Sequence, residues 1–351
     1  MPHLAAQSLT RFAADLLTAG GVRPDEAAEV AESLVQSNLR GHDSHGVMRI
    51  PFYLDGMKKD LARTGAQWTV MKETGTTLVV DGNWGFGQTL ARRLTGRLIE
   101  KARQLGVGVG TMRRSAHVGR LGEYCELAAD AGLVSMMTVN SHGHICRVAP
   151  PGGKAPRLGT NPIAMGVPHP DGALLLDFGT SATAEGKVRV KMIAGQPCPD
   201  GWVIDSEGRP TNDPRALYAD PPGSLLPMGG TQAYKGFGLG LMVEILSGAL
   251  SGGEVMTAVP TAKIGNCVFM LVLDPDHFGG ADHFVRGVTE VASWVRSCPT
   301  VDPQGEILLP GDPERRTLSQ RTSAGIPIDD GNWRALVQLA ERLGVTVPPV
   351  E

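Results

Sequence analysis

The chain has 351 residues, with 33 Lys and Arg against 36 Asp and Glu, and its net charge of -3 argues against a nucleic-acid or membrane surface. Five scattered cysteines without a C-x-x-C pair, and an N-terminus that resembles an amphipathic helix rather than a signal sequence, predict a cytoplasmic protein with reduced thiols. The 46 glycines and 25 prolines are spread along the chain and indicate many tight turns in a folded protein.

Residues 8–40 are expected to form two helices. Pro24 suits the first turn of the second helix, and Gly41 suits its end. Apolar residues such as Val30 and Leu34 recur at helical spacing, which predicts a face packed in the core rather than a functional surface.

The segment GHDSHGVMRIPFY, residues 41–53, follows these helices. His45, Arg49 and Tyr53 are four residues apart and would share one face of a helix. Pro51 requires that helix to begin near Val47. Arg49 offers a planar fork of N–H donors that suits a carboxylate, which makes the segment a candidate substrate site. The spacing equally allows a polar turn in which Arg49 forms a salt bridge.

Strand and helix patterns alternate from residue 76 onward. Strands are expected at TTLVVD, GVGVGTMR, LVSMMTVN, ALLLDFG and CVFMLVLD, and helices at residues 88–105, RLGEYCELAADAG, GFGLGLMVEILSGAL and DDGNWRALVQLAERLG. The pattern predicts an α/β core, residues 76–229, to which a strand at 262–274 returns. A helical domain built from both termini would comprise residues 1–75, joined by 230–258 and 285–351.

No dinucleotide-binding fingerprint of the Rossmann type follows the first strand. The glycines of GVGVGT lie inside a strand pattern, and those of GFGLGL lie inside a helix pattern. A non-Rossmann core is therefore expected.

His117 follows the expected strand GVGVGTM, at the end of a strand where open α/β folds bind ligands. An imidazole there suits proton transfer near neutral pH. The alternative is a structural histidine whose ring is hydrogen-bonded to a loop carbonyl.

Two further segments offer binding chemistry. In NSHGHICRVAPPGG, His142 and His144 alternate, and with Asp276 or His277 they could bind a metal, as in a metal-dependent hydrolase or lyase. Lys235 precedes a glycine-rich helix, where it could meet a phosphate beside helical N–H groups, or simply face solvent.

Taken in order, these segments resemble the malate/L-lactate dehydrogenase family of non-Rossmann oxidoreductases. The matching stretches are RGHDSHGVMRIPFY, SAHVGRLGEY, LGTNPIAMGVP, LLDFGTSATAEGKV, DGWVIDSEGRPTNDP, LLPMGG, YKGFGLGLMVEIL and LPGDPE. The resemblance implies an α/β fold with its own mixed-sheet topology, a homodimer, and NAD or NADP as cofactor. It also implies hydride transfer to or from a 2-oxo acid, a 2-hydroxy acid or a cyclic imino acid.

The resemblance also assigns roles to residues. It makes His117 the general acid/base, and we expect His45 to polarise the same substrate oxygen or to share the role. Substrate contacts would come from Arg49, Tyr53, Thr160 and Asn161. Cofactor contacts would come from Ser141, Asp177, Phe178, Gly179 and Lys235. The rival functions are the metal-dependent enzyme and a nucleotide-binding protein that has lost catalysis.

Overall fold

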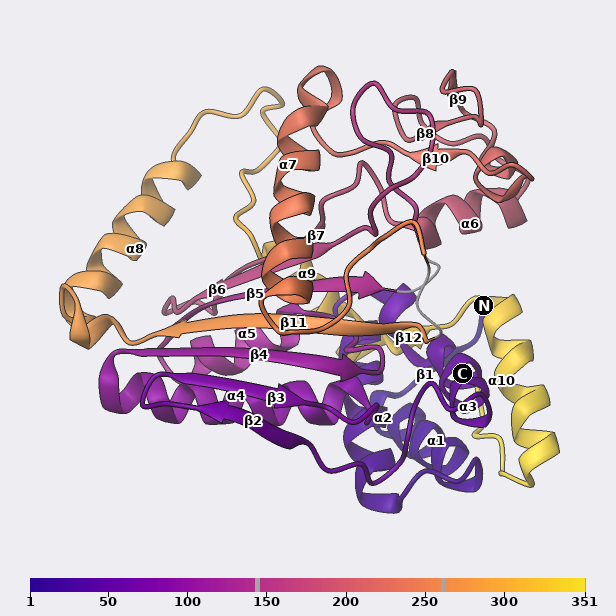
Figure 1. Ribbon diagram of the computed structural model, residues 1–351, viewed down its shortest axis with the longest axis horizontal. Helices are drawn as coiled ribbons and strands as arrows, with labels where there is room; N and C mark the ends of the chain where they lie inside the picture. Colours follow the sequence, from indigo (N-terminus) through magenta and orange to yellow (C-terminus); the bar gives the residue numbers. More distant parts are fainter. Residues whose placement is uncertain (143–145, 260–262, 351) are drawn as a thin grey trace.

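The computed structural model describes residues 1–142, 146–259 and 263–350 and is organised around one seven-stranded sheet (Figure 1). The strand order is β2, β3, β4, β11, β5, β6, β7. These strands are β2 Thr69–Glu73, β3 Thr77–Asp81, β4 Val107–Ser115, β5 Val134–His142, β6 Pro162–Val167, β7 Leu174–Gly179 and β11 Gly265–Leu273. Strands β3 and β4 run parallel, whereas the other neighbouring pairs in this sheet are antiparallel. A doubly wound dinucleotide fold has a mostly parallel sheet. The predicted non-Rossmann mixed sheet is therefore confirmed.

Strand β11 is the central strand, although it is the last of the seven in the chain. It pairs with β4 on one side and with β5 on the other. Its register places Asn266 opposite Ser115 and Gly265 opposite His142. The C-terminal ends of β4 and β5 therefore lie beside the start of β11, at one end of these three central strands. The loops that leave this end are the natural place for a binding site.

Helices cover both faces of the sheet (Figure 1). On one face, α4 (Gly87–Leu105) and α5 (Gly122–Asp130) share a core with the strands. On the other face, α7 (Ala233–Glu244) contacts β5 and β6. Residues 230–258, which contain α7, were predicted to join the terminal helices. The contacts of α7 with β5 and β6 place this helix on the sheet instead.

The helical domain is built from both ends of the chain, as the sequence predicted. Its helices are α1 Ala6–Ala19, α2 Pro24–Leu39, α3 Ile50–Lys58 and α10 Asp330–Leu343. They share one apolar core, in which the ring of Phe12 lies 5.8 Å from that of Trp333. The short strands β1 (His3–Leu4) and β12 (Ile326–Pro327) pair and tie the two ends together. Helix α9 (Asp312–Ala324) packs beside α2.

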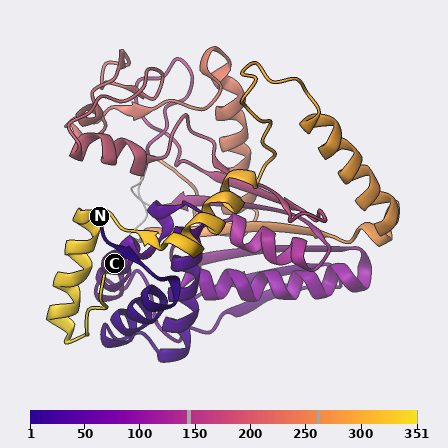
Figure 2. The same ribbon diagram turned by 180° about the vertical axis from the view of Figure 1, so that it is seen from behind.

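Helix α8 (Ala281–Arg296) lies apart from the other terminal helices (Figures 1 and 2). Its main packing partner is the short 3-10 turn Pro275–His277 at the far end of β11. The sequence predicted that residues 285–351 as a block join the helical domain, whereas α8 lies outside it. The reason is that its apolar face is not buried against this chain, since Ala292 is its only buried residue.

A small subdomain stands above the sheet on the side of α7 (Figure 1). It consists of α6 Glu185–Ile193 and the three-stranded sheet of β8 Val203–Ile204, β9 Pro210–Thr211 and β10 Ser224–Leu225. It has its own apolar core and brings Glu185 to the edge of the sheet. Within the described ranges, the helices are all too short or too polar to cross a membrane.

Candidate active site

The segment 41–53 folds as two 3-10 turns, Asp43–His45 and Val47–Arg49, that lead into α3. Pro51 lies in the first turn of α3, where a proline costs no hydrogen bond. The Asn38 side chain fixes the turns, because its oxygen accepts from the N–H of Val47 at 2.9 Å and its nitrogen donates to Asp43 at 2.7 Å. The predicted start of a helix near Val47 is confirmed.

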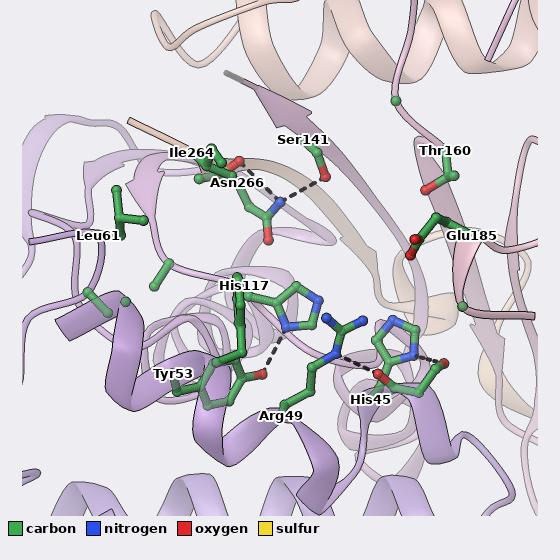
Figure 3. A pocket seen from close by; sticks show the side chains of 18 of the residues that line it. His45, Arg49, Tyr53, Leu61, His117, Ser141, Thr160, Glu185, Ile264 and Asn266 are labelled. Atoms are coloured by element: carbon green, nitrogen blue, oxygen red, sulfur yellow. Dashed lines mark hydrogen bonds between the residues drawn. The ribbon is translucent and has the colours of Figure 1, made fainter. Parts of the chain in front are cut away.

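These turns direct His45, Arg49 and Tyr53 into one cavity of about 310 Å³ (Figure 3). His117, from the loop after β4, lines the same cavity. The four side chains that the sequence singled out from two distant segments therefore meet.

Tyr53 is the hydrogen-bond partner of His117, with 2.8 Å between the phenol oxygen and Nδ1 (Figure 3). The side-chain amide of Gln88 donates to the same phenol oxygen at 2.7 Å. Because Gln88 is the donor in that bond, the hydroxyl proton of Tyr53 is directed at Nδ1 of His117. Neutral His117 then carries its own proton on Nε2.

The backbone at His117 is held from two sides. The N–H of Val118 donates to the side-chain oxygen of Asn266 at 3.1 Å. Gly87, the first residue of α4, packs so closely that an added Cβ would lie 2.4 Å from the carbonyl oxygen of His117. The position of the imidazole is thus fixed by both β11 and α4.

His45 lies face to face with His117, with ring centroids 5.6 Å apart and planes 15° from parallel. Its Nδ1 is 3.1 Å from the hydroxyl oxygen of Ser44. Two imidazoles at this distance repel each other when both are positively charged. At most one of the two rings is therefore favoured in the charged imidazolium form.

Burial controls the protonation of these groups. It lowers the pKa of His45 to about 3, and the positive charge of Arg49 acts in the same direction. Burial also lowers the pKa of His117 well below its ordinary value, again with Arg49 contributing. Burial raises the pKa of Tyr53 to about 12. Both histidines are therefore neutral at pH 7 in the ligand-free protein.

The guanidinium of Arg49 lies beside the two imidazoles in the cavity (Figure 3). Its Nε donates to the carbonyl oxygen of Ser44 at 2.6 Å, which fixes the side chain. Within the described part of the chain, no ion pair joins Arg49 to a carboxylate. The salt-bridge alternative considered from the sequence is therefore wrong.

A second cavity, of about 570 Å³, adjoins the first and shares His45, His117, Ser141 and Thr160 with it. Its wall also contains Asp177, Phe178 and Gly179 at the end of β7, together with Arg120 and Lys187. The Asp177 carboxylate accepts the N–H of Gly122 at 2.7 Å, and burial raises its pKa. The cavity thus gathers four of the five residues expected to contact the cofactor.

Two expected site residues lie elsewhere. The amide of Asn161 is buried and donates to the carbonyl oxygen of Gly240 at 2.9 Å and to the Glu244 carboxylate at 2.7 Å. Asn161 therefore ties β6 to α7 and lines neither cavity. Lys235, in the first turn of α7, is exposed, and its ammonium lies 5.9 Å from the ring of Tyr234.

The suggested metal ligands are far apart. His142 is buried at the end of β5, with its ring 5.9 Å from that of Trp84, and His144 lies outside the described residues. Asp276 and His277 follow the opposite end of β11, and nine residues of strand separate the two ends by about 30 Å. No cluster of three or more potential metal ligands occurs among the described residues.

Several side chains at the cavities could not be identified from the sequence. They are Gln88, Asn266, Arg147 and Glu185. Gln88 is a polar residue on the buried face of an amphipathic helix, and Asn266 is a polar residue at the start of a buried strand, so each offered a weak signal. Arg147 and Glu185 carried no signal beyond their charge.

The comparison with known proteins agrees with this geometry. Residues 4–337 match the family model described as malate/L-lactate dehydrogenase. The chain belongs to the malate/L-lactate dehydrogenase family. A member of this family is a nicotinamide-dependent oxidoreductase, as the sequence predicted. The family assignment leaves the metal-dependent hydrolase or lyase without support.

Three relatives within the malate/L-lactate dehydrogenase family illustrate the match. Hydroxycarboxylate dehydrogenase B of Escherichia coli O157:H7 is 39% identical over 347 residues, which cover 97% of this chain and 94% of that protein. The structure of sulfolactate dehydrogenase from Methanocaldococcus jannaschii aligns with a TM-score of 0.87 at 32% identity and covers 98% of each chain. The structure of delta1-piperideine-2-carboxylate reductase from Pseudomonas syringae pvar. tomato gives 0.84 at 31% identity, over 97% of this chain and 100% of that one.

Proposed function

We propose that this protein interconverts 2-oxo acids and 2-hydroxy acids with NAD(H) or NADP(H), in the cavity between Arg49 and His117. The observation that carries the proposal is the meeting of a guanidinium without an acidic partner and an imidazole oriented by Tyr53 in one small cavity. A cyclic imino acid presents a carboxylate beside a C=N bond and would use the same two groups. Similarity to an imino acid reductase supports that second substrate class.

The second cavity suits the cofactor. Its volume of about 570 Å³ lies in the range of small-molecule sites. Arg120, in its wall, has two buried guanidinium nitrogens, Nε and Nη1, without a hydrogen-bond partner among the described residues. Such donors suit the phosphates of a nicotinamide dinucleotide. Ser141, Asp177, Phe178 and Gly179 would contact the cofactor from the sheet, and its nicotinamide would supply or accept the hydride.

Arg49 would bind the substrate carboxylate through its terminal nitrogens. The bond from its Nε to Ser44 holds the guanidinium in place before substrate arrives. Thr160, on the opposite wall, would add a hydroxyl contact. Orientation of this kind lowers the barrier because the reacting carbon is held in one position.

His117 would move the proton. During reduction, His117 protonated to the imidazolium would give its Nε2 proton to the oxygen of the substrate, which gains negative charge as the carbonyl is reduced, and the ring would return to its neutral form. The carboxylate of a bound substrate would neutralise Arg49 and remove one cause of the low pKa of His117. Substrate binding would then favour proton uptake by His117 at the moment when the proton is needed.

His45 would polarise the same oxygen from the other side of the cavity. Its pKa of about 3 means that it acts as a neutral hydrogen-bonding group. A His117→Ala enzyme with near-normal turnover, beside an inactive His45→Ala enzyme, would reverse these two roles.

We also propose a homodimer, formed over α7 and α8. The outer face of α8 exposes apolar side chains, with Trp294 at 76%, and Val291 and Val295 are exposed beside it. Helix α7 exposes Leu241 and Met242 on the same side of the sheet (Figures 1 and 2). A 16-residue helix with a single buried residue is stabilised only if another surface covers it, and a second copy of this chain offers a complementary apolar helix.

Light scattering after size-exclusion chromatography would test the dimer. The wild type should have twice the chain mass, and Val291→Asp with Trp294→Ser should yield monomers. A wild type that is monomeric at micromolar concentration would refute the proposal.

We also propose that the protein is cytoplasmic and that it divides into a cofactor-binding core and a substrate-contacting segment. Five free cysteines, two of them fully buried, suit a reducing compartment. The cofactor-binding core would comprise residues 76–229 with β11, and residues 1–75 would supply the substrate contacts.

A substrate panel tests the function. Purified enzyme is mixed with 2-oxo acids and cyclic imino acids, and the oxidation of NADH and NADPH is followed separately. We expect turnover with at least one 2-oxo acid and a preference for one cofactor. Binding of NADH or NADPH without oxidation by any of these compounds would support the non-catalytic nucleotide-binding protein instead.

A further inference from the structure

Asn266, near the start of β11, lines both the first cavity and the second, although its side chain is almost entirely buried. In the pairing of β11 with β5 it lies directly opposite Ser141, which also lines both cavities. Opposite residues of an antiparallel pair share one face of the sheet, so their side chains meet. Asn266 and Ser141 therefore form a cross-strand pair where the two cavities join (Figure 3).

The surrounding backbone fixes the orientation of the Asn266 amide. Its oxygen accepts from the N–H of Val118 at 3.1 Å, and its nitrogen donates to the carbonyl oxygen of Asn140 at 2.9 Å. A backbone N–H can only donate and a carbonyl can only accept, so the reversed amide would lose both bonds. The second hydrogen of the nitrogen lies toward the hydroxyl oxygen of Ser141 and the carbonyl oxygen of Gly265, each at 3.3 Å. Because the hydroxyl of Ser141 accepts in this bond, its own hydrogen is directed into the cavities.

A β-bulge beside Asn266 supports this arrangement. Two residues of β4, Arg113 and Arg114, oppose the single residue Cys267 of β11. Arg114 has a φ of +50°, a left-handed conformation that is unfavourable for a side chain of this size, and its Nε donates to the carboxylate of Asp81 at 2.8 Å. The N–H of Cys267 donates to the side-chain oxygen of Asn140 at 3.1 Å. Bulges and strained residues concentrate next to active sites, where they redirect a side chain.

We propose that Asn266 is a positioning residue that holds the peptide after His117 and makes the hydroxyl of Ser141 a hydrogen-bond donor to the cofactor. The inference rests on the proposed function, in which His117 moves the proton and Ser141 contacts the cofactor. Asn266 acts through the N–H of Val118 and through the Ser141 hydroxyl rather than on the reacting atoms. A single amide thereby aligns the group that gives the proton with a group that binds the cofactor.

A double-mutant cycle on cofactor affinity tests the link to Ser141. The dissociation constants of NADH and NADPH are measured by fluorescence titration for the wild type, Asn266→Ala, Ser141→Ala and the double variant. Loss of one hydrogen bond corresponds to a rise of about 2- to 12-fold in the dissociation constant. We expect a rise in this range for each single variant, whereas the double variant should bind no more weakly than Ser141→Ala.

Turnover tests the link to His117. With a 2-oxo acid that the substrate panel identifies, Asn266→Ala should lower kcat by about 10- to 100-fold, because misplacement of a catalytic group by about 1 Å can cost about 100-fold. In the Ser141→Ala background the same substitution should lower kcat by the same factor. Asn212→Ala is the matched control, because Asn212 is exposed and lines neither cavity, and it should leave kcat and both dissociation constants unchanged.

Two results would overturn the inference. One is an effect of Asn266→Ala on the dissociation constant that persists in the Ser141→Ala background, since a general loosening of the fold would act in this way. The other is an unchanged kcat in Asn266→Ala. If circular dichroism shows that Asn266→Ala is unfolded, Asn266→Ser is measured in its place and must meet the same expectations. A wild type that binds neither NADH nor NADPH would reject the proposed function itself, and the inference with it.

Discussion

Replacement of Tyr53 by Phe removes the hydroxyl that joins Gln88 to His117. Gln88 is completely buried, and the oxygen of its amide already lacks a partner among the described residues. The substitution would leave its nitrogen without an acceptor as well, which costs about 1–3 kcal/mol for an unsatisfied buried group. We therefore expect Tyr53→Phe to lower the free energy of unfolding by about that amount.

A second substitution tests whether the unsatisfied amide of Gln88 causes the loss of stability in Tyr53→Phe. Gln88→Leu in the Tyr53→Phe background replaces the unsatisfied amide by an apolar group of similar size, which should recover most of the lost stability. Urea unfolding of the wild type, both single variants and the double variant gives a coupling free energy, and we expect about 1–3 kcal/mol. Equal stability of Tyr53→Phe and the double variant would refute the reasoning.

Activity should not recover with stability. Both Tyr53→Phe and the double variant lack the group that orients His117, so kcat/KM should fall by about 10- to 100-fold in each. The loss is smaller than the 10²- to 10⁴-fold contribution of a general acid because the imidazole itself remains. This divergence between stability and activity separates the role of Tyr53 in orientation from its role in packing.

Other predictions concern the remaining cavity residues. Arg49→Lys should lower kcat/KM for a 2-oxo acid by about 10-fold or more, since lysine lacks the planar fork, and an unchanged value would reject the carboxylate contact. The native pKa values of His45 and His117 lie below 6.5, so the folded state binds fewer protons and stability should fall as the pH drops below 6.5. By pH 5 the protonation of His45, whose pKa is about 3, should cost about 2 kcal/mol, and a His45→Gln, His117→Gln double variant should lose the pH dependence in urea unfolding. Gly87→Ala should displace the backbone of His117 and reduce kcat more than it alters the KM of the cofactor, which steady-state kinetics would measure.

The parts of the fold that could be predicted were those with local signals. Pro24, Gly41 and Pro51 mark helix ends by their own backbone chemistry, and the long apolar runs of the central strands are visible without any tertiary information. The positions of α7 and α8 could not be predicted in this way. Whether an amphipathic helix packs on a sheet, on other helices or on a second chain depends on partners that its own sequence does not specify.

In the candidate site, too, features with a local sequence signal could be predicted, whereas contacts between distant residues could not. The spacing of His45, Arg49 and Tyr53 predicted a shared face, and the structure directs all three into one cavity. The contact between Tyr53 and His117 joins residues 64 positions apart, so no local pattern could reveal it. Asn161 was grouped with its neighbour Thr160, but successive side chains of an extended segment diverge, and only Thr160 lines the cavity.

The central place of β11 bears on how the chain is synthesised. Strands β4 and β5 cannot complete their hydrogen bonding until residues 265–273 are inserted between them. About three quarters of the polypeptide must therefore leave the ribosome while two apolar strand edges remain open. Pairing over such sequence distances is slow, which makes this chain a natural client for chaperones that shield unpaired strands during translation.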